Sequence, residues 1–399
     1  MKEFNTILEA CKKVDFTQRK AALATVVKVR GSSYRSPGAR MLITDDGKWV
    51  GSISGGCLEG DALRKARQVM MNKIPMTVTY DTREESNQNL GIGLGCNGVI
   101  DVLIEPVNLQ DKNNPVFFFE SILRMNAAVA LATVFDGQDK KSIGSKLLLT
   151  SGATKLHNLS NHQLEQIITT DLESLFETKK SEAKKYQTEE GEVEVFVELI
   201  QPSVSVIIFG GGFDARPVSQ FAKSLGWEVM VTDECVAHIA PIFFPDADKL
   251  SLCHRDFIDR DFNITPYTAC ILMSHNYEYD RDVLKKLLRS DTPYIGILGP
   301  RKRFDKMLKE FSDQKIELSK EDFHRIHSPI GLDIGAETPD EIAVSIIAEI
   351  QSKFSNRSGG FLKYQPGPIH QRDQQSGQVF KQVFLNIEDE KKSASFQQK

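Results

Sequence analysis

Residues 204–215 read VSVIIFGGGFDA, an apolar run that leads directly into three glycines. The apolar run predicts a buried strand, and helical spacing predicts a helix from about Arg216 to Leu225, directly after the glycine-rich loop. A second apolar run at 228–232 ends at Asp233. A strand, a glycine-rich loop, a helix and a further strand, in this order, predict a Rossmann-like unit.

The glycine-rich loop also fits the dinucleotide-binding pattern G-x-G-x-x-G/A, with Gly210, Gly212 and Ala215 at the three defined positions. Asp233 lies 23 residues after Gly210, near the spacing of about 20 residues at which a carboxylate binds a ribose hydroxyl. The same turn is needed merely to join a strand to a helix. The pattern therefore favours a nucleotide site and a purely structural loop about equally.

The same pattern continues toward the C-terminus, where three further strands are predicted, at 249–252, 268–273 and 294–298. Residues 202–355 are therefore expected to form a doubly wound α/β domain with a parallel sheet. Ser274 and His275 directly follow one of the strands, and ligands bind at the carboxyl ends of parallel strands. Both are candidate pocket residues, although a single histidine can equally be structural.

Upstream, residues 54–60 read SGGCLEG, and apolar residues then recur at helical spacing as far as Met70. Gly55 and Gly56 permit positive φ and a close approach of the backbone to a ligand. Cys57 follows at the start of the predicted helix, where the dipole attracts anions and favours the thiolate. Such a thiol can be a nucleophile, a metal ligand or a sulfur carrier. A tight turn with a cysteine used only for packing explains the spacing equally well.

A second glycine-rich loop, GIGLGCNG at residues 91–98, places Cys96 before another predicted strand. Packing is again the alternative interpretation for this cysteine. Two glycine loops with cysteines in a single mixed α+β domain, predicted for residues 1–110, favour a shared site.

The pattern of this domain returns in weaker form in residues 111–201. ALATV at 130–134 repeats 22–26, and GSKLLLT at 144–150 resembles GARMLIT at 38–44. A degenerate second copy, packed on the first and without glycine–cysteine loops, is therefore expected. Its charged stretch at 179–192 is predicted to be a helix end and loop, and the polar residues 356–399 are predicted to be a partly disordered tail.

Composition narrows the function further. The net charge of -4 over 399 residues, without a long basic run, argues against nucleic-acid binding. No stretch approaches the roughly 18 apolar residues of a spanning helix, so a cytoplasmic protein without a membrane role is expected. The six cysteines show no CxxC spacing, so reduced thiols are expected in place of a zinc site or a disulfide framework.

In these motifs the chain resembles the XdhC/CoxI family of xanthine dehydrogenase accessory proteins. The N-terminal motifs that carry the resemblance are GSSYR at 31–35, PGARM at 37–41, GSISGGCLE at 51–59 and GCNG at 95–98. The C-terminal ones are the Rossmann loop with Asp233, Ser274-His275, YIGILG at 294–299 and the segment 329–341.

The resemblance implies a maturation factor for xanthine dehydrogenase-type molybdenum hydroxylases. Such a factor binds the molybdenum cofactor, holds it while a cysteine desulfurase supplies the terminal sulfur, and delivers it to the apo-enzyme. Helix-end amides and arginines suit the phosphate of this anionic pterin, and a thiolate suits its metal or a persulfide. The resemblance assigns Cys57 as the metal-side or sulfur-carrying thiol, Cys96 as a second thiol, and five residues as cofactor-binding: Arg35, Arg40, Gly55, Gly56 and Glu59.

Two other interpretations remain. The first is an NAD(P)-dependent oxidoreductase that uses the loop between Gly210 and Asp233, with His275 or a cysteine beside the substrate. No histidine is near either glycine–cysteine loop in sequence, which weakens this interpretation because a dehydrogenase needs a proton-transfer group. The second is a structural component of a hydroxylase complex with chemically idle cysteines. A homodimer is compatible with all three and required by none.

Overall fold

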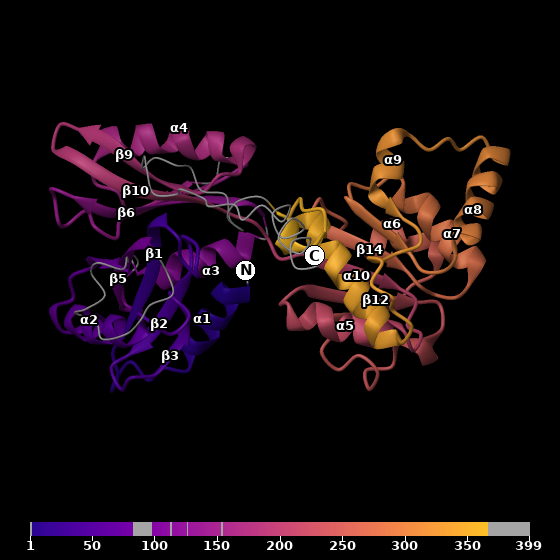
Figure 1. Cartoon of the computed structure of the whole chain (residues 1–399), viewed down its shortest axis with the longest axis horizontal. Helices are drawn as coiled ribbons and strands as arrows, with labels where there is room; N and C mark the ends of the chain where they lie inside the picture. The colour runs from indigo at the N-terminus through magenta and orange to yellow at the C-terminus, as the bar shows by residue number, and fades with distance from the viewer. Residues whose placement is uncertain (1, 83–97, 112–113, 126, 153–154, 366–399) are drawn as a thin grey trace, which may run out of the picture.

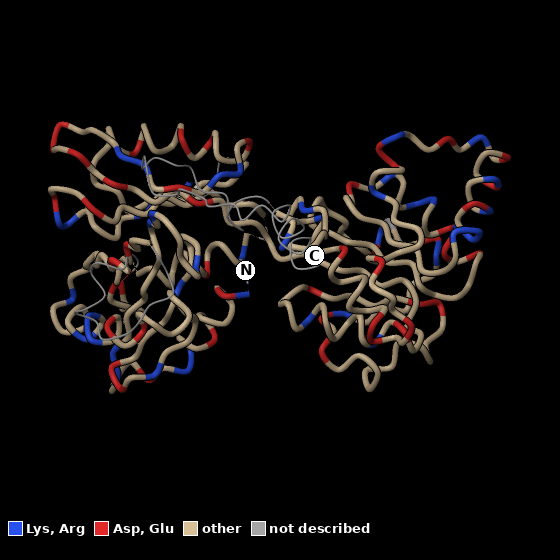
Figure 2. Tube along the Cα trace, viewed as in Figure 1, with Lys and Arg blue, Asp and Glu red and all other residues tan. Residues whose placement is uncertain are grey.

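The computed structural model describes residues 2–82, 98–111, 114–125, 127–152 and 155–365. Three sheets organise this part of the chain. Two of them lie together in the N-terminal half, and the third forms a separate C-terminal domain (Figure 1). Charges of both signs are interspersed over both halves (Figure 2). Cys96 lies outside the described residues.

The first sheet is antiparallel and has five strands in the order β3-β2-β1-β5-β4. The strands are β1 (Ala21–Gly31), β2 (Arg40–Thr44), β3 (Trp49–Gly51), β4 (Met76–Asp81) and β5 (Gly98–Val107), with helices α1 (Lys2–Lys12) and α2 (Glu59–Asn72). Residues along β1 alternate between two cores. Ala22, Ala24 and Val26 pack under α2, whereas Leu23 and Val27 belong to the cores that the second sheet completes.

The second sheet repeats the first. Its order is β8-β7-β6-β10-β9, again antiparallel, with the pair Ala130 and Leu149 taking the place of Ala22 and Ile43. The elements are α3 (Pro115–Met125), β6 (Val129–Gly137), β7 (Lys146–Thr150), β8 (Lys155–His157), α4 (His162–Thr178), β9 (Glu182–Thr188) and β10 (Gly191–Ile200). The predicted internal repeat is confirmed.

The prediction of a helix end and loop at 179–192 was wrong for most of that stretch, because residues 182–188 form the edge strand β9. Tyr186 and Thr188 are buried on its inner face, and Lys184 and Lys185 reach glutamates and aspartates near the surface. An edge strand tolerates such charges because only one side of its backbone is paired.

Two buried ion pairs join the repeats. Arg40 of the first repeat contacts Glu198 of the second, and Lys146 of the second contacts Glu105 of the first. The positions correspond, since each cation also donates to the carbonyl of the glycine two residues before it, Gly38 in one repeat and Gly144 in the other. All four charged side chains are at most 7% exposed, so each charge depends on its partner in the opposite repeat.

The C-terminal sheet is parallel, with the order β13-β12-β11-β14-β15-β16. Its strands are β11 (Ser205–Phe209), β12 (Glu228–Asp233), β13 (Lys249–Leu252), β14 (Thr268–Leu272), β15 (Tyr294–Ile297) and β16 (Ile326–His327). Helices α5 (Ala215–Ser224) and α10 (Pro339–Phe354) cover one face, and α7 (Tyr277–Leu287) and α8 (Arg301–Asp313) cover the other. Two short helices, α6 (Ile258–Asp261) and α9 (Lys320–Arg325), complete the domain. The predicted doubly wound fold is confirmed.

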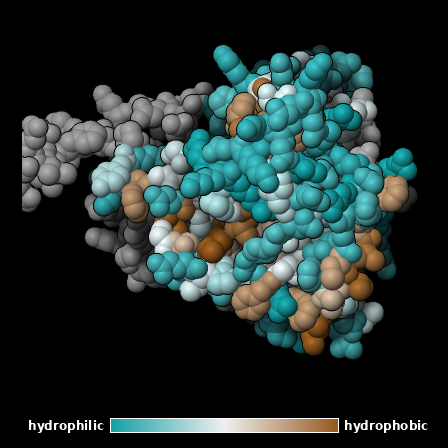
Figure 3. All heavy atoms as spheres, turned by 90° about the vertical axis from the view of Figure 1, so that its right-hand side faces the viewer, coloured by the Kyte–Doolittle hydropathy of each residue, from teal (hydrophilic) through white to brown (hydrophobic). Residues whose placement is uncertain are grey.

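The start of α1 touches the C-terminal domain. The ammonium of Lys2 donates to the carbonyl of Ser224 at the end of α5, and the stem of Lys2 lies against Gly226. The outer end of the C-terminal domain, away from the N-terminal sheets, is predominantly hydrophilic (Figure 3). Among the described residues, every helix is too short or too polar to cross a membrane.

The buried pairs generate a stability prediction. Glu198→Gln leaves the Arg40 guanidinium buried without a countercharge, so the free energy of unfolding of the N-terminal half should fall by about 3–5 kcal/mol. The control is Glu192→Gln on the same strand, whose pair with Lys185 is more than half exposed and should cost about 0–1 kcal/mol. The chain has two tryptophans, so urea unfolding followed by Trp49 in a Trp227→Phe background reports on the first sheet. Equal losses in the two variants would contradict the prediction.

Candidate functional site

One edge of the first sheet gathers the loops that carry the N-terminal motifs. Antiparallel pairing places the end of β1 opposite the start of β5, at Gly31 and Gly98, and the end of β3 beside the start of β2, at Gly51 and Met41. The loops 32–39, 52–58 and 83–97 therefore all leave the sheet at this edge. The topology brings the segments of both glycine–cysteine loops together, although Cys96 itself is not described.

The loop before α2 is wound around the carboxylate of Glu59, which is 3% exposed. One oxygen accepts hydrogen bonds from the Ser52 hydroxyl at 2.8 Å and from the amides of Ile53, Ser54 and Gly55 at 3.1, 3.0 and 3.3 Å. The other accepts from the Ser54 hydroxyl and from the amides of Gly56 and Leu58 at 2.9 and 3.1 Å. Glu59 thus satisfies the donors that the end of α2 and its loop present.

This arrangement gives Glu59 a structural task. Burial alone would raise its pKa, but the hydrogen bonds from Ser54, Ser52 and the loop amides outweigh burial and lower the pKa from 4.5 to about 2. The sequence predicted that helix-end amides would attract the phosphate of a ligand. The structure fills the described part of that position with the Glu59 side chain instead.

Cys57 is held at the surface by this wound loop. Ile53 and Leu58 anchor the loop in the core under α2, whereas Gly55, Gly56 and Cys57 between them are exposed, and the thiol is free. Both glycines have positive φ, +88° and +122°. The thiol is therefore presented on a loop of fixed course and not packed in the core.

Tyr34 completes the surface beside the thiol loop. Its ring lies so close to Gly55 that a Cβ there would come within 2.8 Å of Tyr34 Cδ1. The ring itself is 72% exposed and so offers a flat apolar surface to a ligand. No periodicity in the sequence indicates this contact, because it joins two loops from different strands.

The two arginines assigned to the cofactor lie in different environments. Arg40 is buried in the ion pair with Glu198, so its charge is balanced within the protein. Arg35 is about one-third exposed and donates to Glu3 Oε1 on α1 at 2.6 Å. It lines a cavity of about 300 Å³ at the end of β3. Of the two, only Arg35 has access to a ligand.

In the C-terminal domain, the carboxylate of Asp233 is turned inward. Its oxygens accept hydrogen bonds from the amides of Gly211 at 2.9 Å and Cys235 at 2.8 Å, and Nδ1 of His238 lies 3.0 Å away. A Cβ on Gly211 would come within 2.5 Å of the His238 carbonyl, so the segment with His238 covers the glycine loop. A ribose hydroxyl would have to compete with these contacts for Asp233.

The switch point between β11 and β14 is covered by His275. This residue has φ +59°, its Nε2 lies 3.2 Å from Asp214 Oδ2, and a Cβ on Gly212 would lie 3.5 Å from the ring. Gly210 has positive φ and packs against the backbone of Ser274. The four predicted residues Gly210, Gly212, Ser274 and His275 are thus brought together, with the imidazole above the glycine that would approach a pyrophosphate.

A small cavity of about 170 Å³ adjoins His275, between the ends of β14 and β15. Arg303 lines it and donates to the buried carboxylate of Asp280 at 2.6 Å, which also accepts from the Ser274 hydroxyl at 2.6 Å. Burial raises the pKa of Asp280 against these hydrogen bonds. The sequence did not single out Arg303, because its partner lies on the preceding helix.

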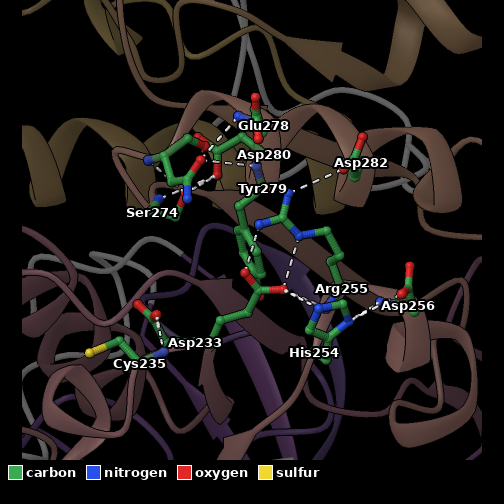
Figure 4. A network of polar contacts seen from close by, with 12 residues as sticks. Asp233, Cys235, His254, Arg255, Asp256, Ser274, Glu278, Tyr279, Asp280 and Asp282 are labelled. Atoms are coloured by element: carbon green, nitrogen blue, oxygen red, sulfur yellow. Dashed lines mark hydrogen bonds and ion pairs between the residues drawn. The ribbon is translucent and has the colours of Figure 1, made fainter.

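A second polar network occupies the same edge. Arg255 donates to both oxygens of Glu234 and to Asp282, and Figure 4 shows its guanidinium between residues that follow β12 and β14. The side chain of Arg255 lowers the pKa of Glu234. These charges are paired within the domain. Within the described ranges, no three His, Cys, Asp or Glu side chains are placed to hold a metal ion, so Cys57 would be a single protein ligand.

Known proteins match the chain over most of its length. Residues 17–81 match the model of the XdhC and CoxI family, and residues 206–350 match that of the XdhC Rossmann domain. A protein from Bacillus subtilis, named as a probable xanthine dehydrogenase component, is 30% identical over 350 residues, which is 88% of this chain and 97% of that protein. The molybdenum cofactor insertion chaperone PaoD from Escherichia coli is 22% identical, with 88% of each chain covered.

A solved structure agrees. The crystal structure of a xanthine dehydrogenase from Bacillus halodurans superposes with a TM-score of 0.71 and 31% identity, covering 92% of this chain and 98% of that one.

The Glu59 contacts predict a pH dependence. Because the folded pKa of about 2 is below the usual 4.5, the carboxylate stabilises the fold above pH 4.5, and this contribution is lost as the pH falls toward 2. Glu59→Gln should therefore cost the first sheet about 3 kcal/mol at pH 7, a difference that shrinks below pH 4.5. Trp49 fluorescence in the Trp227→Phe background measures it, with exposed Glu192→Gln as the control. A constant difference from pH 7 to pH 3 would contradict this account.

Proposed function

The chain belongs to the XdhC and CoxI family, and from this premise we propose that it is a non-catalytic maturation factor that binds the molybdenum cofactor for a xanthine dehydrogenase-type hydroxylase. The exposed Cys57 thiol on the Glu59-centred loop carries this proposal. The relative PaoD, a molybdenum cofactor insertion chaperone, supports it, as does the match to the probable xanthine dehydrogenase component from Bacillus subtilis.

The residues at the sheet edge suit the chemistry of this cargo. A soft thiolate such as that of Cys57 is a suitable ligand for a sulfur-bound metal, and it can equally carry sulfur as a persulfide. The exposed ring of Tyr34 offers stacking area to the planar pterin. Arg35 supplies the accessible positive charge for a phosphate. Gly55 and Gly56 keep the loop thin, so that a ligand can approach the backbone.

The finer steps belong to the same proposal. A cysteine desulfurase supplies the terminal sulfur while the cofactor is held at Cys57, and the loaded protein then docks on the apo-hydroxylase. Cys96 remains a predicted second thiol of the site. A homodimer is compatible with this sequence of events and has no part in it.

Nucleotide binding by the C-terminal domain is the second candidate function. The parallel strand order and the loop from Gly210 to Gly212 favour it. The inward hydrogen bonds of Asp233 and the position of His275 oppose binding in the usual dinucleotide pose. An increase in melting temperature with NAD or NADP, lost in Gly212→Val, would support this candidate.

The cargo proposal predicts different behaviour for two exposed cysteines. Cys57→Ser should lower the molybdenum and pterin content per chain at least about tenfold, a loss of about 1.4 kcal/mol or more in binding. Cys235→Ser, which changes the exposed thiol of the C-terminal domain, should leave the content unchanged. Both are measured by metal analysis and pterin fluorescence after anaerobic purification from a host that makes the cofactor.

Equal content in wild type and both variants would remove Cys57 from the site. Absence of molybdenum and pterin from the wild type, together with a response to NAD or NADP, would overturn the carrier proposal in favour of the oxidoreductase.

A further inference from the structure

The cavity beside Arg35 lies between α1 and the edge of the first sheet. It has a volume of about 300 Å³ and six lining residues, Lys2, Glu3, Thr6, Ile7, Arg35 and Gly51. This volume is at the lower end of the range for small-molecule sites, roughly 300–1,000 Å³. Two of the lining side chains are cations, and one is an anion.

The cavity shares a wall with the thiol loop. Gly51 lines it, and the chain continues from Gly51 directly into the loop that winds around Glu59 and presents Cys57. Gly51 has φ +91°, and a Cβ there would collide with the Arg40 carbonyl. The backbone at the cavity wall is therefore fixed in relation to the thiol loop.

Within the cavity, Glu3 holds the position of an anion. Its Oε1 accepts from Arg35 Nη2 at 2.6 Å and from the Arg40 amide at 3.3 Å. A guanidinium and a backbone amide that converge on a single oxygen are the donors that proteins commonly offer to a phosphate oxygen. Both side chains of the Glu3–Arg35 pair are about one-third exposed, so a ligand can reach the pair from solvent.

We propose that this cavity is a phosphate-binding subsite with Arg35 as its principal cation, and that the Glu3 carboxylate occupies Arg35 until a phosphate group displaces it. The identification of that group as the phosphate of the bound cofactor rests on the proposed function. Lys2, the second cation, is anchored on the Ser224 carbonyl of the C-terminal domain, so both halves of the protein contribute to the subsite.

The test uses inorganic phosphate and the full-length protein without cofactor, with binding followed by calorimetry or by phosphorus NMR. Glu3→Gln removes the competing charge and should tighten phosphate binding about two- to fivefold, the range expected for release of a partly exposed ion pair. Arg35→Gln should abolish binding. Glu9→Gln, on the exposed side of the same helix in a surface pair with Lys12, should bind like the wild type.

Arg35→Lys guards against a folding defect, because it keeps the charge but loses the planar fork, and it should bind more weakly than the wild type and more tightly than Arg35→Gln. The proposal is overturned if Glu3→Gln binds no better than Glu9→Gln, or if Arg35→Gln binds as the wild type does. Molybdenum content is scored separately. Phosphate results as expected, in a protein that never carries molybdenum, would retain the subsite and reject the proposed cargo.

Discussion

The N-terminal half depends on one buried carboxylate. Glu59 accepts hydrogen bonds from most of the backbone between Ser52 and Leu58, so a loop with two adjacent glycines takes a single course. Without an internal acceptor, these donors at the start of α2 would need water or a ligand. Because the protein supplies its own anion here, the loop is formed before any ligand arrives. An external phosphate is then better served elsewhere, and the cavity at Arg35 provides the accessible cation.

The two N-terminal repeats divide structure from chemistry. Both have the same strand order, and each contributes one cation and one carboxylate to the buried pairs between them. Only the first repeat carries the thiol loop and its glycines. The second repeat covers the other face of the first sheet and balances the charge of Arg40. This explains why Arg40 and Arg35, five residues apart in one motif, have different roles.

Much of the fold could be predicted from the sequence, because it is written in local patterns. The apolar run before Gly210 and the helix after it identify the parallel sheet, and ALATV at 130–134 reveals the repeat. The edge strand 182–188 was missed, since its charged residues hide the alternation that burial of Tyr186 requires. At the site, spacing identified Cys57 and its glycines. It could not assign Glu59 an inward role, place Tyr34 over Gly55 or pair Arg35 with Glu3, because these contacts join segments that only the folded sheets bring together.

The pairing of Arg40 with Glu198 spans 158 residues and has a consequence for biosynthesis. On the ribosome, the first sheet emerges long before the carboxylate that its buried arginine requires. Folding of the segment that carries the thiol must therefore wait for, or remain reversible until, the second repeat has been synthesised. A nascent chain interrupted between the repeats would expose an apolar sheet face and an unpaired cation. Such a fragment would be recognised by chaperones and proteases and would not survive as a partial carrier.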